Sequence, residues 1–165
     1  MPDVQIHYVL LGGLAIALLV AAFTDIRRRQ IDNWLNLAIA LTAPLYWWAA
    51  GLSWNAIGWQ FGSAAIAFVC LATLFALRQM GGGDVKLLTA LALWIEPVWF
   101  LRLLVIMALL GGALTIGLYL YNRHRKIVGQ LKVPYGVAIA SAGLWVLAVQ
   151  NLPSFSPPFL GGGAG

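Results

Sequence analysis

The chain has 165 residues, of which 62% are hydrophobic and 9% charged, and its net charge is +5. Soluble domains are about 45–50% apolar and about 25% charged, so this composition excludes a soluble globular domain and a disordered chain. It predicts an all-α polytopic membrane protein. One span takes about 20 residues, so at most about seven fit. The spans and their short loops must therefore carry any chemistry.

The first three apolar runs are separated by one polar segment and one short turn. Residues 6–23 form the first run, which is longer than a signal-peptide core and lacks a basic segment before it, so we interpret it as a retained span. The polar segment TDIRRRQIDN (24–33) follows. The second apolar run covers residues 34–50, and the short turn GLSWN separates it from the third run at 57–77.

The next stretch, residues 87–121, is almost entirely apolar and too long for one span. As a single helix it would measure roughly 52 Å, against a hydrocarbon core of about 30 Å. Proline disrupts the helix before it, so the Glu96-Pro97 pair marks a break. The sequence therefore predicts a short fourth span over 84–95 and a long fifth span over 98–121.

A basic loop, NRHRKIVGQLK, separates the fifth run from a sixth over 133–149. We therefore expect a six-helix bundle that forms a single membrane domain over residues 1–152, followed by a flexible Pro/Gly-rich tail over 153–165. Small residues recur at the four-residue spacing that lets membrane helices approach closely, as in Gly13/Ala17, Ser63/Ala67, Ala113/Gly117 and Gly136/Ala140.

Basic residues give the expected orientation. Nine of the ten fall after spans one, three and five, namely Arg27, Arg28, Arg29, Arg78, Lys86, Arg123, Arg125, Lys126 and Lys132. The positive-inside rule places these loops in the cytosol and both termini outside. In a chain this apolar the charge indicates orientation and not nucleic-acid binding. The expected outer loops are flanked by an aromatic belt of Trp47, Trp48, Trp54, Trp59, Trp94 and Trp99.

Two of the five acids stand out by position. Asp25 closes the first span and Asp84 opens the fourth, so the topology brings both to one membrane face. Acids at membrane depth indicate function, although Asp25 could be an interfacial carboxylate neutralised by the arginine run and Asp84 a helix N-cap. The run Gly81-Gly82-Gly83 before Asp84 favours a site, because glycine lets another chain approach closely.

Three sequence elements together carry a family resemblance. The first is D-x-R-x-x-x-I-x-N at Asp25, Arg27, Ile31 and Asn33; the second is GGGDVKLL at 81–88; the third is Val133-Pro134-Tyr135-Gly136. In this order and spacing they resemble the type IV prepilin peptidase family, which are membrane aspartic proteases of the GxGD kind. The size is similar to the short Tad/Flp-pilus branch, without a recognisable methyltransferase region.

The resemblance implies an aspartic endopeptidase in the bacterial inner membrane, with Asp25 and Asp84 as its catalytic pair and neither metal nor other cofactor. Two close carboxylates share one proton, and such a pair can activate water. The implied substrates are prepilins, whose short basic leader is cut after a glycine before a hydrophobic helix. Implied supporting residues are Gly81, Gly83, Lys86, Arg27, Asn33, Pro134, Tyr135 and Gly136.

One position departs from the family pattern, and other function classes compete. Asp32 stands where family members usually have proline, which puts the loop entry into the second span in doubt. A small transporter or channel could use Asp25 and Asp84 as ion or proton sites, although transporter sites lie near the midplane and these acids lie at one face. A non-enzymatic assembly subunit would not need the GGGD run.

Overall fold

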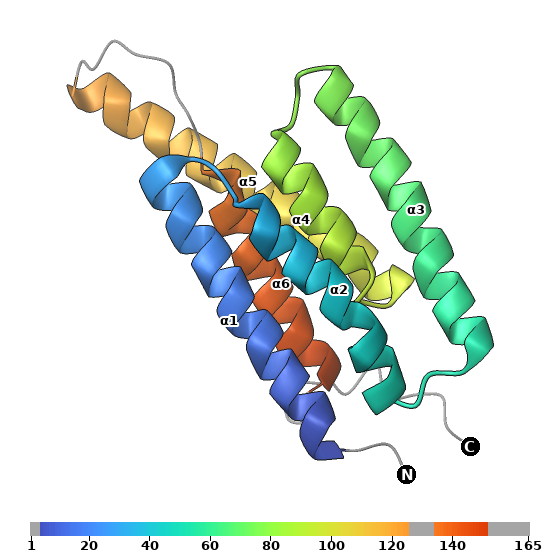
Figure 1. The fold of residues 1–165 in the computed structure, drawn as a ribbon. Helices are drawn as coiled ribbons and strands as arrows, with labels where there is room; N and C mark the ends of the chain where they lie inside the picture. The colour runs from blue at the N-terminus through green and yellow to red at the C-terminus, as the bar shows by residue number, and fades with distance from the viewer. Residues whose placement is uncertain (1–3, 126–133, 152–165) are drawn as a thin grey trace, which may run out of the picture.

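The computed structural model describes residues 4–125 and 134–151, and all regular structure in these two ranges is helical. The helices form an up-and-down bundle (Figure 1). They are α1 Val4–Arg28, α2 Asn33–Ala49, α3 Trp54–Ala76, α4 Gly82–Ala92, α5 Pro97–Arg125 and α6 Tyr135–Asn151. The predicted all-α six-helix bundle is therefore confirmed. The predicted 153–165 tail lies outside the described residues, as does most of the loop before α6.

The short helix α4 lies at the centre of the bundle. It has 11 residues, which gives a length of about 16 Å, and it ends just before the predicted break, with Pro97 as the first residue of α5. Leu87, Leu88 and Leu91 are fully buried, because α4 packs against α2, α3, α5 and α6. These contacts bury the leucine side of α4, whereas Lys86 on the same helix is exposed.

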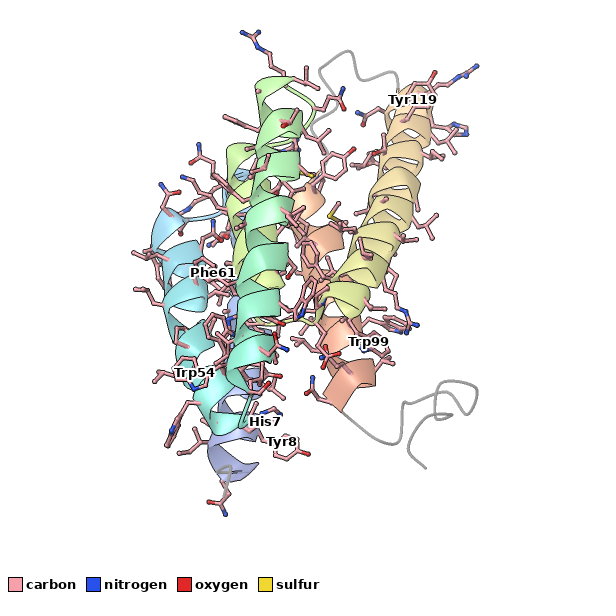
Figure 2. All side chains as sticks on the ribbon, turned by 90° about the vertical axis from the view of Figure 1, so that its right-hand side faces the viewer. His7, Tyr8, Trp54, Phe61, Trp99 and Tyr119 are labelled. Atoms are coloured by element: carbon pink, nitrogen blue, oxygen red, sulfur yellow. The ribbon has the colours of Figure 1, made fainter. Side chains whose placement is uncertain are left out.

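Three of the helices are long and apolar enough to cross a membrane, namely Gln5–Arg28, Trp54–Ala76 and Pro97–His124. Their outward faces carry apolar side chains over most of their length (Figure 2). Together with the shorter apolar α6, they make the chain a multi-pass membrane protein.

The tryptophans follow the predicted belt only in part. Trp54 and Trp99 lie at the end of the bundle that also carries Tyr8, as Figure 2 shows. Trp47 and Trp94 are instead buried, and each indole N–H donates a 2.8 Å hydrogen bond to a backbone carbonyl, of Leu93 and Ile39 respectively. A buried indole needs such an acceptor, and the carbonyls at the end of α4 and within α2 supply it.

The connections α1–α2 and α3–α4 lie at the same end of the bundle (Figure 1). We call this the Asp25 end. The small-residue pattern is used unevenly: Gly136 and Ala140 pack closely in α6, whereas a side chain at Gly13 or Gly117 would meet nothing within 4 Å. The spacing alone therefore does not show which small residues lie at a helix contact.

Candidate active site

The Asp25 carboxylate is held by the beginning of α6. Asp25 lies in the last turn of α1 and is 7% exposed. Its Oδ2 accepts a 2.7 Å hydrogen bond from the Gly136 backbone N–H, and the Val137 backbone also bonds to this carboxylate. The first N–H groups of a helix have no acceptor within the helix and carry the positive end of its dipole. The start of α6 therefore fixes this acid.

Gly136 is required for that approach. A Cβ atom added to Gly136 would lie 2.8 Å from Asp25 Oδ2 and 2.9 Å from its Cγ. These separations are well inside van der Waals contact, so any side chain at position 136 would displace the carboxylate. Gly136 was predicted as a substrate-positioning residue, and the structure places it directly against Asp25.

Asp84 lies in the first turn of α4. The N-cap of this helix is Gly81, so the N-cap interpretation of Asp84 is wrong. The Asp84 carboxylate instead bonds back to the Gly81 backbone, as acids at the third helical position do in a capping box. A Cβ atom on Gly81 would lie 2.9 Å from Asp84 Oδ2, so glycine leaves room for this acid.

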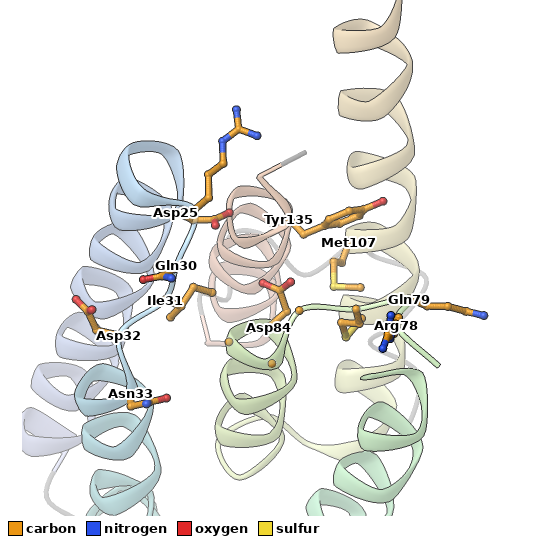
Figure 3. Close-up of a pocket in the computed structure, with 15 residues that line it drawn as sticks. Asp25, Gln30, Ile31, Asp32, Asn33, Arg78, Gln79, Asp84, Met107 and Tyr135 are labelled. Carbon is orange, nitrogen blue, oxygen red and sulfur yellow. The ribbon is translucent and has the colours of Figure 1, made fainter. Parts of the chain in front are cut away.

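The two acids line one cavity of about 970 Å³ at the Asp25 end of the bundle. Figure 3 shows the Asp84 side chain pointing from α4 into the space between Asp25 and Tyr135. The two carboxylates are close enough to interact electrostatically. The fold thus brings together two acids that are far apart in the sequence.

Other predicted site residues also reach this cavity. Asn33, Gly81, Gly83 and Tyr135 belong to its lining. Gly83 packs tightly against the loop before α2, because a Cβ atom there would lie 3.3 Å from Cβ of Ile31. The three elements of the sequence pattern therefore meet at one site.

Besides Gly136, three predicted supporting residues lie outside the lining of this cavity. The Arg27 guanidinium is exposed and stands 5.2 Å from the centre of the Phe23 ring. Lys86 Nζ donates a 2.8 Å hydrogen bond to Asn33 Oδ1. The Pro134 carbonyl accepts from the Val137 N–H at 3.2 Å, so Pro134 contributes to the start of α6.

Asp32 occupies the position where the resembled family usually has proline. Its backbone has φ −65° and ψ 135°, and proline itself fixes φ near about −65°. The aspartate therefore has a backbone conformation that proline could also adopt. Asp32 also lines the cavity and adds a third carboxylate to the site.

Sequence reasoning missed several lining residues. They are Arg29, Gln30, Arg78, Gln79, Met80 and Met107. Arg29 and Arg78 have φ values of 53° and 60°, a left-handed conformation that is uncommon without glycine. No local sequence pattern predicts an arginine in that conformation. Met107 was missed because it lies within an ordinary apolar run of α5. Within residues 4–125 and 134–151, no group of three or more His, Cys, Asp or Glu is placed to hold a metal ion.

The fold and the site define a class: a multi-pass all-α membrane protein with two acids from different helices in one cavity. Comparison with known proteins gives the family. The model of the type IV leader peptidase family matches residues 13–116, a range that includes Asp25 and Asp84. The chain belongs to this family.

Relatives with curated names agree with the family. The chain is 31% identical over 148 residues to proteins named prepilin leader peptidase/N-methyltransferase from Aeromonas hydrophila and Aeromonas salmonicida (strain A449). Each match covers 82% of this chain but 49% and 48% of the two relatives, so the chain spans about half the length of the curated relatives it matches. No solved structure matches the chain.

Proposed function

We propose that this chain is an aspartic endopeptidase that removes the short basic leader of Flp-type prepilins, after a glycine, at the cytosolic face of the bacterial inner membrane. The observation that carries the proposal is the shared cavity of Asp25 and Asp84, in a chain of the type IV leader peptidase family. The relatives are named as peptidases, and a peptidase activity fits this site because the cavity supplies a carboxylate pair.

The proposed reaction needs only water and the two acids. Two carboxylates in one cavity share a proton, because ionising both is unfavourable. The ionised member takes a proton from a water molecule, whose oxygen attacks the peptide carbonyl. The protonated member donates to the developing oxyanion, and a proton then passes to the leaving nitrogen as the C–N bond breaks. Either Asp25 or Asp84 can be the ionised member, with the other as the protonated member.

The cavity also offers features that suit an extended, positively charged leader. Asp32 adds a third carboxylate to a lining that also contains Arg29 and Arg78. A chain that enters the cavity would therefore meet both acidic and basic side chains. The three carboxylates are the groups that would pair with the basic residues of a leader.

The test is direct cleavage. The purified protein in detergent is incubated with pilin candidates encoded beside it, and the products are measured by mass spectrometry. We expect one cut that releases the basic leader after a glycine and leaves the hydrophobic helix intact. Intact candidates throughout, with ion or proton flux through the protein in vesicles, would instead support the transporter alternative.

A further inference from the structure

A second cavity opens on the side of the bundle, between α2 and α3 and over α4. Its volume is about 370 Å³, and its lining is mostly apolar. In Figure 1, α2 and α3 lie apart from each other with α4 next to both, consistent with their packing against α4. We call this cavity the side groove, lined by Asn33, Asn36, Leu37, Ala40, Phe68, Lys86, Thr89, Ala90 and Leu93.

The side groove adjoins the cavity of the two acids. Asn33 lines both cavities. Lys86 Nζ donates to Asn33 Oδ1 at 2.8 Å, and Lys86 is two residues from Asp84 on the same helix. Asn33 and Lys86 therefore form the boundary that a peptide held at the acids would pass to reach the apolar groove.

Asn36 is the unusual residue of the groove. It is 5% exposed, and its Nδ2 donates to the Gly83 carbonyl at 3.4 Å. A carbonyl can only accept, so this bond fixes which side of the amide faces Gly83. The other side, Oδ1, is buried and receives no hydrogen bond from any residue that the structure describes. An unpaired buried acceptor costs free energy, so a hydrogen bond from a bound molecule would stabilise it.

We propose that the side groove binds the first turn of the hydrophobic helix that follows the scissile bond, and that Asn36 Oδ1 accepts a hydrogen bond from a backbone N–H of that turn. The inference rests on the proposed function. The first four N–H groups of any helix lack an acceptor within the helix, and lipid cannot supply one. The substrate thus brings unpaired donors and apolar side chains, and the groove offers an unpaired acceptor within apolar walls.

The position of Asn36 agrees with this role. Its partner Gly83 immediately precedes Asp84 in α4, so a backbone held by Asn36 lies next to the acids. Leu37, Ala40 and Phe68 extend the apolar wall away from them along α2 and α3. Asn36 is therefore a positioning residue, which contributes to substrate binding by holding the residues after the scissile bond.

Cross-linking identifies the occupant. The test variant is Leu37→Cys and the control is Ala38→Cys, each in a Cys70→Ser, Asp84→Asn background. The substrate is a pilin candidate that the unmodified enzyme cleaves, with one cysteine placed just after its scissile glycine. Leu37 lines the groove, whereas the exposed Ala38 on the same helix does not. We expect at least tenfold more disulfide adduct at position 37. Equal adducts, or none at position 37 because lipid fills the groove, would overturn the inference.

Blocking the groove tests the same site without cross-linking. Ala40→Trp fills the groove, and Ala38→Trp adds the same side chain outside it. We expect kcat/KM to fall at least tenfold for Ala40→Trp and less than twofold for Ala38→Trp, with equal folded yields. Equal cleavage by both variants would overturn the inference while leaving the peptidase function intact, whereas failure of the unmodified enzyme to cleave would overturn that function itself.

Asn36→Leu separates positioning from general support. The change keeps the approximate size but removes the acceptor. We expect KM to rise about tenfold while kcat stays within about threefold, as expected when binding is lost equally from the ground and transition states. A fall in kcat with KM unchanged would contradict the proposal, because it would mean that Asn36 acts only through Gly83.

Discussion

Gly136 connects the start of α6 to Asp25, one of the two acids that we propose to be catalytic. Its N–H holds Asp25 Oδ2 at 2.7 Å, and a Cβ atom in its place would lie 2.8 Å from the same oxygen. The residue therefore does two things that only glycine can do together at this position. It brings the helix start within hydrogen-bonding distance of the carboxylate, and it leaves the carboxylate room.

We expect Gly136→Ala to lower the cleavage rate about a hundredfold, since a displacement of about 1 Å at a reacting group has effects of that size. Overpacking of this kind costs about 1–3 kcal/mol of stability, which a well-packed bundle can tolerate. The control is Gly112→Ala, where a new Cβ would meet nothing within 4 Å. Cleavage rates and unfolding curves of both variants check this. Normal cleavage by Gly136→Ala would show that the contact to Asp25 is not needed.

At the scale of single residues, the sequence identified the two acids but not their surroundings. Asp25 and Asp84 were found because acids are rare in this chain and both fall at one predicted face. The contact between Asp25 and Gly136 depends on how α1 and α6 pack, which no local pattern encodes. Asn36 could have been found, because a polar residue within an apolar run is itself a signal.

The end of α3 shows how a helix terminates in this bundle without glycine. The Gln79 N–H donates to the Leu74 carbonyl and the Arg78 N–H to the Phe75 carbonyl, each at 2.9 Å, which is the Schellman pattern. Its left-handed position is filled by Arg78, with φ 60°. The end of α2 uses Gly51 at the equivalent place, with φ 66°.

We expect Arg78→Gly to raise the free energy of unfolding by about 1 kcal/mol, because left-handed backbone costs about 1–2 kcal/mol in residues other than glycine. Ala38→Gly, at an exposed position inside α2, should lower it by about 1 kcal/mol. Thermal unfolding in detergent, followed by tryptophan fluorescence, measures both. A loss of stability in Arg78→Gly would mean that the arginine side chain contributes more than the strain costs.

At the scale of helices, the sequence predicted the number, order and approximate bounds of the elements. Long apolar runs and the Glu96-Pro97 pair were sufficient for this, because polar residues, glycine or proline follow the apolar runs. The apolar run ends before α1 does: the helix continues through Asp25 to Arg28, although Ile26, Arg27 and Arg28 are exposed. The burial of Trp47 and Trp94 was also missed, because the sequence alone does not distinguish a tryptophan at the membrane interface from one in the protein core.

For the whole molecule, the alternating helix directions place the α1–α2 and α3–α4 connections at one end (Figure 1). The basic residues predict that this end faces the cytosol. Single cysteines at Asn55 and His124, each in a Cys70→Ser background, test this orientation. We expect an impermeant thiol reagent to label Asn55→Cys in intact cells and His124→Cys only after lysis. The reverse labelling would contradict the orientation and the proposed cytosolic site.

The central claim is that Asp25 and Asp84 act as a pair while Asp32, in the same cavity, does not. The most direct measurement compares cleavage of one prepilin by Asp25→Asn, Asp84→Asn and Asp32→Asn, with folded yields determined in parallel. Each amide keeps the side-chain shape but cannot transfer the proton. We predict that the first two variants lose at least about a thousandfold in rate while Asp32→Asn keeps more than about a tenth. Cleavage by either of the first two, or its loss in Asp32→Asn alone, would contradict the account.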